Sequence, residues 1–395
     1  MPDPAVVPFA NFQYEIYGKG ALSGERPELP ITYAGLESAA RERLSPEAFG
    51  YVAGGAGVER TVAANVSAFE RWELVPRMLR DVSARDLATS VLGVAMPAPV
   101  MLAPVGVQSI IHPEAELAVA RAAAGLDVPF ILSTAASHTI EQVAEAAGGA
   151  SRWFQLYWPR GRDLASSLVG RAEQAGYGAV VVTLDNFLLS WRPRDLQGAY
   201  LPFLKGEGVA NYFSDPAFRA ALESSPEEDQ VAAIGHWATQ FPNPGVTWSD
   251  LEWLRAQTGL PILLKGILHP DDARRALEHG VDGLVVSNHG GRQVDGAIAS
   301  LDALPSIRAA VGDELPVLLD SGIRSSADVV KALALGANAV CIGRPYVWGL
   351  ALAGQAGVEH VLRCLLAELD LTMALTGHAT LAELDAGALC PRPRE

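Results

Sequence analysis

Three side chains suited to acid–base chemistry on a small organic acid stand in the second half of the sequence: Lys265, His289 and Arg292. A histidine exchanges a proton near neutral pH, and an arginine binds a carboxylate through two parallel hydrogen bonds. His289 and Arg292 share one short glycine-rich stretch. They could therefore hold the two ends of a 2-hydroxy acid, with the carboxylate on Arg292 and the hydroxyl or Cα–H near His289. The alternative is a structural histidine beside a solvated arginine.

Lys265 ends the apolar run PILLK, where an unpaired ammonium group would be costly to bury. Three functions fit a lysine at such a place: neutralising an anionic cofactor ring, forming a Schiff base, or binding a phosphate. The structural alternative is a lysine whose stem follows the apolar rim while its ammonium group reaches water. The residue type alone leaves all four interpretations open.

Two later runs end in glycine followed closely by arginine: Gly322 with Arg324, and Gly343 with Arg344. Glycine lets backbone N–H groups approach a phosphate, and arginine adds a fork of hydrogen-bond donors. The last two strands of an α/β barrel are the usual place for such a phosphate site. We therefore predict a phosphate-bearing ligand here, with ordinary turns and solvated arginines as the alternative.

Eight short apolar runs supply the strands that must position these groups. Amphipathic stretches separate them, so strands and helices alternate. Runs of this composition are typical of parallel strands buried on both faces, and their count favours a (β/α)8 (TIM) barrel over a doubly wound α/β sheet. Because the carboxyl ends of barrel strands share one mouth, we expect the candidate residues to meet there. The runs are Pro99–Ala103, Pro129–Ser133, Trp153–Leu156, Ala179–Thr183, Pro261–Lys265, Gly283–Ser287, Pro316–Asp320 and Ala339–Gly343.

The whole chain, residues 1–395, is predicted to form one domain, with an N-terminal helical segment (1–97) before the barrel (98–395). Residues 196–249, between the fourth and fifth strands, are predicted to be a long loop insertion at the barrel mouth. A lid is its functional interpretation, and a disordered or oligomer-contact loop is the alternative. The predicted helices are Tyr33–Arg43, Pro46–Val52, Glu114–Gly125, Thr139–Ala147, Asp163–Ala175, Pro270–His279 and Ser325–Leu335.

Composition limits the possible partners. A net charge of −15 and a pI of about 5.0 argue against nucleic acid or an anionic membrane as partner. No apolar run is predicted to be long enough to span a bilayer, and the N-terminal residues lack the order of a signal peptide. The three cysteines (Cys341, Cys364 and Cys390) and the eight histidines have no disulfide or metal-ligand spacing. We expect a cytoplasmic protein without a bound metal.

The stretches Ser287–Gly296 (SNHGGRQVDG) and Leu319–Pro345 resemble the FMN-dependent L-2-hydroxy acid oxidase and dehydrogenase family. The resemblance extends from about Tyr33 to the C-terminal helix, and the His-Gly-Gly-Arg element with the upstream Lys-Gly pair is highly specific. Within the family, YVAGGAG (51–57) and WRPRDL (191–196) are similar to the lactate 2-monooxygenases. The resemblance implies FMN as cofactor, a 2-hydroxy acid and O2 as small-molecule partners, and a homo-tetramer or octamer.

The resemblance also assigns roles to residues that match the family's motifs. It implies that His289 is the active-site base, that Tyr51, Arg192 and Arg292 bind the substrate carboxylate, and that Tyr157 bonds near the substrate hydroxyl. It further implies that Lys265 stabilises the reduced flavin. The cofactor-binding residues that it implies are Ala103, Pro104, Val105, Gly106, Ser133, Gln155, Thr183, Lys265, Ser287, Asp320, Gly322, Arg324, Gly343 and Arg344.

Two positions bear on the outcome of the reaction. Gly106 stands where simple oxidases of the family usually carry alanine, which implies the lactate 2-monooxygenase reaction: L-lactate and O2 to acetate, CO2 and water. Ala135 stands where some relatives carry a bulky residue, which implies a wider pocket. The alternatives are an oxidase that releases the 2-keto acid and H2O2, on a larger substrate, and a flavin- or phosphate-binding barrel without turnover.

Overall fold

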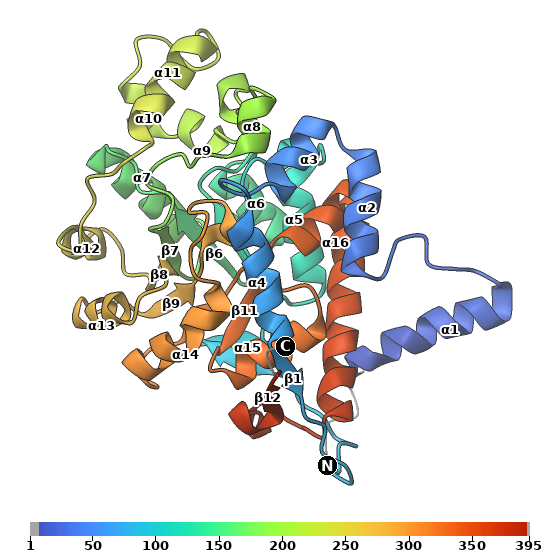
Figure 1. Ribbon diagram of the computed structural model, residues 1–395. Helices are drawn as coiled ribbons and strands as arrows, with labels where there is room; N and C mark the ends of the chain where they lie inside the picture. Colours follow the sequence, from blue (N-terminus) through green and yellow to red (C-terminus); the bar gives the residue numbers. More distant parts are fainter. Residues whose placement is uncertain (1–7, 393–395) are drawn as a thin grey trace.

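Parallel strands close into a barrel at the centre of the structure, a computed structural model that describes residues 8–392 (Figure 1). Within that range the barrel has eight strands, in the spatial order β10-β11-β4-β5-β6-β7-β8-β9. Each predicted apolar run coincides with one strand to within two residues, so the predicted (β/α)8 barrel is confirmed. The strands are β4 (Val100–Leu102), β5 (Phe130–Ser133), β6 (Arg152–Leu156), β7 (Val180–Thr183), β8 (Ile262–Ile267), β9 (Gly283–Val286), β10 (Val317–Leu319) and β11 (Ala339–Ile342).

The helices surround the barrel, and every predicted helix is present to within two residues (Figure 1). Thr139 caps its helix as expected, because its side chain accepts a hydrogen bond from the backbone of Gln142. One barrel helix, α14 (Ser300–Val311), was not predicted because Pro305 inside it is a helix-breaking signal. The predicted helices are α2 (Tyr33–Arg43), α3 (Pro46–Ala53), α5 (Ala115–Gly125), α6 (Ile140–Ala147), α7 (Arg162–Gln174), α13 (Pro270–Glu278) and α15 (Ser326–Ala334).

The helix after the last strand, α16 (Arg344–Leu375), packs along α5 and α2. By length and composition α16 could cross a membrane, contrary to the prediction that no such run exists. Charged residues such as Glu359 interrupt the apolar run in the sequence, and non-helical backbone at Ala353 and Gly354 kinks the helix. More than half of its most apolar stretch is buried inside the protein, and this packing accounts for its apolar composition.

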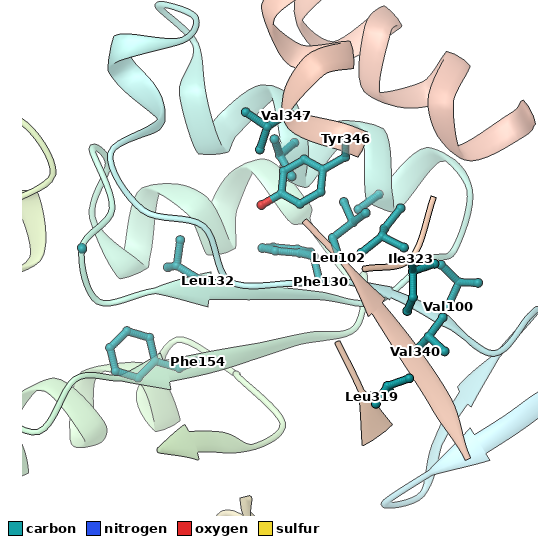
Figure 2. Close-up of a cluster of buried hydrophobic side chains, with 14 of the residues drawn as sticks. Val100, Leu102, Phe130, Leu132, Phe154, Leu319, Ile323, Val340, Tyr346 and Val347 are labelled. Atoms are coloured by element: carbon teal, nitrogen blue, oxygen red, sulfur yellow. The ribbon is translucent and has the colours of Figure 1, made fainter. Parts of the chain in front are cut away.

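Side chains along each strand alternate between the surrounding helices and the barrel interior. Outward residues such as Leu102, Phe130 and Phe154 join the main core, together with Tyr346 of α16 (Figure 2). Inward residues form a separate apolar layer: Met101, Ile131, Trp153, Val181, Leu263, Val285, Leu318 and Cys341. Two positions further along the chain lies the layer that faces the mouth, here called the upper layer: Ala103, Ser133, Gln155, Thr183, Lys265, Ser287, Asp320 and Gly343.

The N-terminal segment closes the opposite end of the barrel, where Val91 and Met96 of a β-hairpin join the inward apolar layer. The first helix, α1, extends away from the barrel (Figure 1). The predictions for residues 1–7 and 393–395 lie outside the described residues. The elements outside the barrel are α1 (Phe12–Ser23), α4 (Arg60–Glu70), β1 (Trp72–Leu74), which pairs with β12 (Leu389–Pro391), and the hairpin of β2 (Thr89–Val91) and β3 (Val94–Met96).

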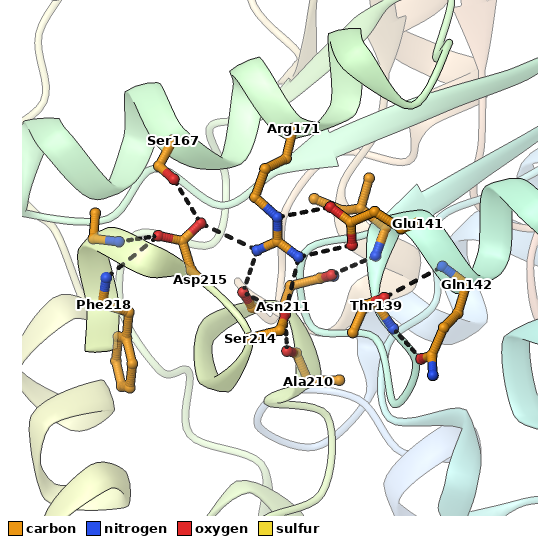
Figure 3. Close-up of polar contacts among 12 residues, drawn as sticks. Thr139, Glu141, Gln142, Ser167, Arg171, Ala210, Asn211, Ser214, Asp215 and Phe218 are labelled. Atoms are coloured by element: carbon orange, nitrogen blue, oxygen red, sulfur yellow. Dashed lines mark hydrogen bonds and ion pairs between the residues drawn. The ribbon is translucent and has the colours of Figure 1, made fainter. Parts of the chain in front are cut away.

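Residues 196–249, predicted to be a loop, fold into a series of short helices. The insertion was predicted but its helices were not, because four of them have only four or five residues and carry little periodic signal. Arg171 on α7 anchors this insertion, since its guanidinium donates to Asp215 at 3.1 Å and to the Asn211 carbonyl oxygen at 2.9 Å, while also binding Glu141 of α6 (Figure 3). The helices are α8 (Pro193–Gln197), η3 (Pro202–Lys205), α9 (Ala210–Phe213), α10 (Pro216–Ala220) and α11 (Gln230–Gln240), followed by α12 (Asp250–Arg255).

Candidate active site

Lys265 occupies the upper layer at the end of β8 and is buried with two polar partners. Its Nζ donates to Ser287 Oγ at 2.8 Å and lies 3.2 Å from Asp320 Oδ2. Burial alone would lower the pKa of Lys265, but the carboxylates of Asp320 and Asp185 outweigh it and hold the pKa above its ordinary value. The ammonium group therefore stays charged, which argues against the Schiff-base interpretation because that chemistry needs a neutral amine.

His289 follows β9 in the turn η4 (His289–Gly291), and both of its ring nitrogens have partners. Nδ1 lies 2.9 Å from Asp185 Oδ1, and Nε2 lies 3.4 Å from the Tyr157 hydroxyl in the cavity. The backbone of His289 has a left-handed φ of 60°, and its N–H donates to Ser287 Oγ at 3.0 Å. A carboxylate on Nδ1 directs the reactive nitrogen, Nε2, towards the cavity. Asp185 was missing from the predicted site, although its place just after the fourth strand was a usable signal.

The pKa of His289 sets the expected pH dependence of the reaction. Burial lowers this pKa, Asp185 raises it in part, and Lys265 lowers it again, so the net pKa lies below its ordinary value. A base works in its neutral form, so we expect kcat/KM to be constant at neutral pH and to fall only as the pH drops below about 6.5, the ordinary histidine pKa. An Asp185→Asn variant, which lacks the charge that raises the pKa, should move this acid limb to lower pH. A limb that moves to higher pH in that variant would contradict the assignment.

Arg292 and Arg192 bring two positive charges to the same cavity, which Tyr51 also lines. Arg292 lies with its guanidinium carbon 5.0 Å from the centre of the Tyr51 ring and donates to the Tyr51 and Gly54 carbonyl oxygens. Arg192 donates to Gln293 Oε1 at 2.8 Å. Burial, followed by the nearby charge of Arg192, lowers the pKa of Arg292 to about 10. A bound carboxylate would relieve the repulsion between Arg192 and Arg292. This agrees with their predicted role in binding the substrate carboxylate.

The two predicted phosphate-binding elements meet at the other end of the cavity, where Gly343 precedes α16. Arg324 lies over the Tyr33 ring at 4.3 Å. Burial and the charges of Arg324 and Arg292 lower the pKa of Arg344 to about 9. Positive charge therefore exceeds negative charge at this end of the cavity, as it does around Arg192 and Arg292. The Arg344 guanidinium donates to three backbone carbonyl oxygens, those of Val52, Gly54 and Gly290. Its role as a phosphate ligand stays a prediction that requires some of these bonds to be exchanged.

Most of the predicted residues line one cavity, and four lie beside it. Ser133, Ser287, Gln155 and Thr183 are buried outside its lining; Ser133 Oγ donates to Gln155 Oε1 at 2.9 Å. The structure brings together in the cavity wall Tyr51, Ala103, Pro104, Val105, Gly106, Tyr157, Arg192, Lys265, His289, Arg292, Asp320, Gly322, Arg324, Gly343 and Arg344. The predicted residues thus form one site, and their individual roles stay predictions.

An aromatic wall, which the sequence did not reveal, lines the same cavity. It consists of Phe203, Tyr212, Trp237 and Phe241, all contributed by residues 196–249, and the small side chain of Ala135 is part of the same lining. Phe203 and Trp237 stack with ring centres 4.7 Å apart. Aromatic residues scattered along an insertion have no spacing that marks them as neighbours, so no sequence signal could have grouped them.

The residues at this mouth fit FMN. Two buried polar atoms of the upper layer, Gln155 Nε2 and Thr183 Oγ1, have no hydrogen-bond partner among the described residues. A flavin ring carries the donors and acceptors that such atoms need, and buried polar groups are costly when unpaired. The N-terminus of α16 and Arg324 would hold the phosphate, with Lys265 and the upper layer at the ring. FMN, when bound, supplies the acceptor for the two electrons of a hydroxy acid oxidation. Among residues 8–392 there is no cluster of three metal-ligating side chains.

The fold and this mouth define a class of protein: barrel oxidoreductases that hold a phosphate-bearing flavin beside a histidine–carboxylate pair. Residues 40–391 match the family described as FMN-dependent dehydrogenase. The chain belongs to this family and is an FMN-dependent enzyme that oxidises 2-hydroxy acids.

Individual relatives agree with that assignment. The chain is 47% identical over 380 residues to the FMN-dependent alpha-hydroxy acid dehydrogenase qulF of Penicillium citrinum, covering 95% of this chain and 94% of that protein. It is 46% identical over 355 residues to an L-lactate oxidase of Lysinibacillus sphaericus, covering 90% and 91% of the two chains. Among solved structures, mandelate oxidase superposes with a TM-score of 0.81 at 42% identity, covering 92% of this chain and 98% of that one.

Proposed function

We propose that this enzyme is a lactate 2-monooxygenase, which converts L-lactate and O2 to acetate, CO2 and water. The observation that carries the proposal is a cavity with two arginines and an aromatic wall in its lining: Arg192 and Arg292 line it together with the four aromatic residues of the insertion. A keto acid formed there keeps its carboxylate between two arginines, so its release is slow. The reaction balances, because the three carbons of lactate appear as acetate and CO2 and its oxygen atoms plus O2 appear in the three products.

The residues of the chain have distinct parts in this proposal. Arg192 and Arg292 bind the carboxylate, and Tyr157 donates a hydrogen bond to the substrate hydroxyl. His289 takes one proton from the substrate, and Asp185 stabilises the imidazolium that results. Both routes, hydride transfer from Cα and proton removal from Cα, require this one base. In the second stage O2 takes up the two electrons removed from lactate and becomes H2O2 beside the retained pyruvate. Pyruvate and H2O2 then react to acetate, CO2 and water, so H2O2 is consumed before either can leave.

The insertion is proposed to act as a lid over the retained product. Its anchored part, around Asn211 and Asp215, is held by Arg171 and includes Tyr212 of the aromatic wall. We therefore place the moving part at the other wall residues, Phe203 before it and Trp237 and Phe241 after it. The wall contacts the cavity but does not contribute to the barrel strands. A lid of this kind excludes water and delays release.

A second candidate function is an oxidase that releases the 2-keto acid and H2O2, on a larger substrate. The small side chain of Ala135, which lines the same cavity as the aromatic wall, favours it, because it leaves room for an apolar substituent of the substrate. Relatives named L-lactate oxidase and 4-hydroxymandelate oxidase show that members of this family have different substrates. Stoichiometric H2O2, with keto acid as the only carbon product, would establish this function instead.

Anaerobic bleaching of the flavin by a panel of L-2-hydroxy acids, followed by product analysis in air, tests both candidates. Acetate and CO2 from L-lactate support the monooxygenase. If the protein is yellow but none of the acids bleaches its flavin, the chain is a flavin-binding barrel without turnover, the third alternative given above.

Replacing Gly106 by alanine should shift the products from acetate towards pyruvate and H2O2. A Cβ at position 106 would lie 2.8 Å from the Ala135 carbonyl oxygen and 2.9 Å from its Cβ, so the Ala135 loop must move and the closed pocket loosens. The ratio of acetate to pyruvate at full conversion measures the effect. Gly170→Ala is the matched control, because a Cβ there meets no atom within 4 Å. An unchanged ratio in Gly106→Ala would contradict this interpretation of position 106.

We propose a homo-tetramer or octamer in which α1 contacts a neighbouring copy. An isolated helix of 12 residues is marginal in water, and α1 has no buried residue. Tyr14, Tyr17 and Leu22 are 64%, 68% and 91% exposed on it. Changing all three to glutamate should lower the mass measured by light scattering, while barrel stability is unchanged. An unaltered mass would exclude α1 as the contact.

We also propose a cytoplasmic location, which the free thiols of Cys341, Cys364 and Cys390 support because the reducing cytoplasm preserves thiols. The strongly negative chain is further proposed to bind neither nucleic acid nor an anionic membrane. Cell fractionation tests the location, and recovery of the protein in the membrane pellet would contradict it.

A further inference from the structure

A second cavity lies directly beside the active site and shares Thr183 and Asp185 with its machinery, but neither substrate nor FMN is placed in its space by the proposed reaction. It has a volume of about 490 Å³ and lies at the carboxyl ends of β7, β8 and β9. Asn186 and Phe241 line both cavities and so form the wall between them. The chain segment that returns from the insertion contributes Val246 and Trp248 to the lining. The cavity is large enough for a molecule with one aromatic ring.

The two cavities have opposite charge. Four arginines and Lys265 line the active-site cavity, whereas no lysine or arginine lines the second one. The charged side chains in the lining of the second cavity are Asp185 and Asp272. An anion such as a hydroxy acid therefore has no partner there, and a cation has two.

The lining of the second cavity also contains hydrogen-bond acceptors that lack donors. Asp185 Oδ1 is bonded to His289, but Asp185 Oδ2 is buried and has no partner among the described residues. Asn186, only 8% exposed, also has an unpartnered Oδ1, but its amide lies beside Tyr157 in the wall that the two cavities share. An unpaired carboxylate oxygen such as Asp185 Oδ2 is costly, and an N–H donor that reached it would satisfy it. The rings of Trp158, Phe241 and Trp248 provide the apolar and π surface that favours an aromatic or alkyl cation.

We propose that this cavity is a second binding site, which takes a small arylalkylammonium ion with its ammonium group on Asp185 Oδ2 and its ring among the tryptophans. The ligand shares one carboxylate with the catalytic histidine. A cation on Asp185 Oδ2 draws negative charge away from the imidazolium that Asp185 stabilises, so proton transfer to His289 slows. Arg192 and Arg292 lie outside the lining of this cavity, although Gln293 of the lining accepts a hydrogen bond from Arg192, so we expect carboxylate binding to change little. The ligand is therefore a regulator that lowers kcat and leaves KM unchanged.

Calorimetric titration of the FMN-loaded enzyme with 2-phenylethylammonium tests the site, with the neutral 2-phenylethanol as matched ligand. We expect saturable binding of the cation and at least about tenfold weaker binding of the alcohol, since the alcohol lacks the charge. Val246→Trp, which fills the cavity, should weaken cation binding by about tenfold or more. Asp272→Asn should weaken it by about two- to fivefold, as expected for a partly exposed ion pair.

Val231→Trp is the matched control, because Val231 is 81% exposed on α11 and lies outside the cavity lining. It should bind the cation as the parent does. Steady-state rates with a bleaching hydroxy acid should show a lower kcat at constant KM. Equal binding of the alcohol, binding unaffected by Val246→Trp, or competition with the hydroxy acid would each overturn the proposal. Calorimetry needs no turnover, so the site can be confirmed even if the proposed monooxygenase reaction fails.

Discussion

A His289→Gln variant should reduce its flavin about 10²- to 10⁴-fold more slowly than the parent, the range expected for loss of a general base. His289 Nε2 faces the cavity beside the Tyr157 hydroxyl, and Nδ1 is held by Asp185 at 2.9 Å. Glutamine preserves a polar side chain there but cannot accept the substrate proton near neutral pH. Anaerobic rapid mixing with substrate, followed by the absorbance of the oxidised flavin, measures the rate.

The same variant should still bind FMN and a carboxylate ligand, because Arg192, Arg292 and the upper layer are unchanged. Titration with a non-reducing acid such as oxalate is the control for binding. Tyr157→Phe is the matched comparison, because it removes one hydrogen bond near Nε2 and leaves the base in place; its loss of rate should be smaller. Flavin reduction at nearly the parent rate in His289→Gln would show that the base is elsewhere.

Lys265→Met should lower the free energy of unfolding of the apoprotein by about 3–5 kcal/mol, the cost of removing one partner from a buried ion pair. Lys265 and Asp320 are 4% and 6% exposed, and their charged atoms lie 3.2 Å apart. Methionine matches the length of lysine but leaves Asp320 buried without a counter-charge. Urea unfolding followed by tryptophan fluorescence measures the change.

The double variant Lys265→Met/Asp320→Asn distinguishes the ion pair from simple loss of packing. Asparagine carries no charge, so much of the lost stability should return in the double variant. FMN affinity should stay low in both variants, since neither has a cation at position 265. A single variant as stable as the parent would mean that the buried pair contributes nothing to the fold.

The sequence by itself determined the barrel, because each strand is a short apolar run and the runs alternate with helices along the chain. It also placed His289, Arg292, Lys265 and the Gly-Arg elements at strand ends, and strand ends of a barrel meet at one mouth whatever the details of packing. These inferences depend only on local periodicity and on the symmetry of a closed parallel sheet.

Tertiary structure alone decided which of these groups touch. The bond between Asp185 and His289 joins residues 104 positions apart, and the aromatic wall gathers Phe203, Tyr212 and Trp237 from an insertion without periodicity. The carbonyl partners of Arg344 and the second cavity behind Asp185 are likewise results of packing between distant segments. Short-range sequence patterns specify helices and strands. The partner of a buried charge is determined only when these elements pack together, because packing excludes water and makes the charge pairing strong.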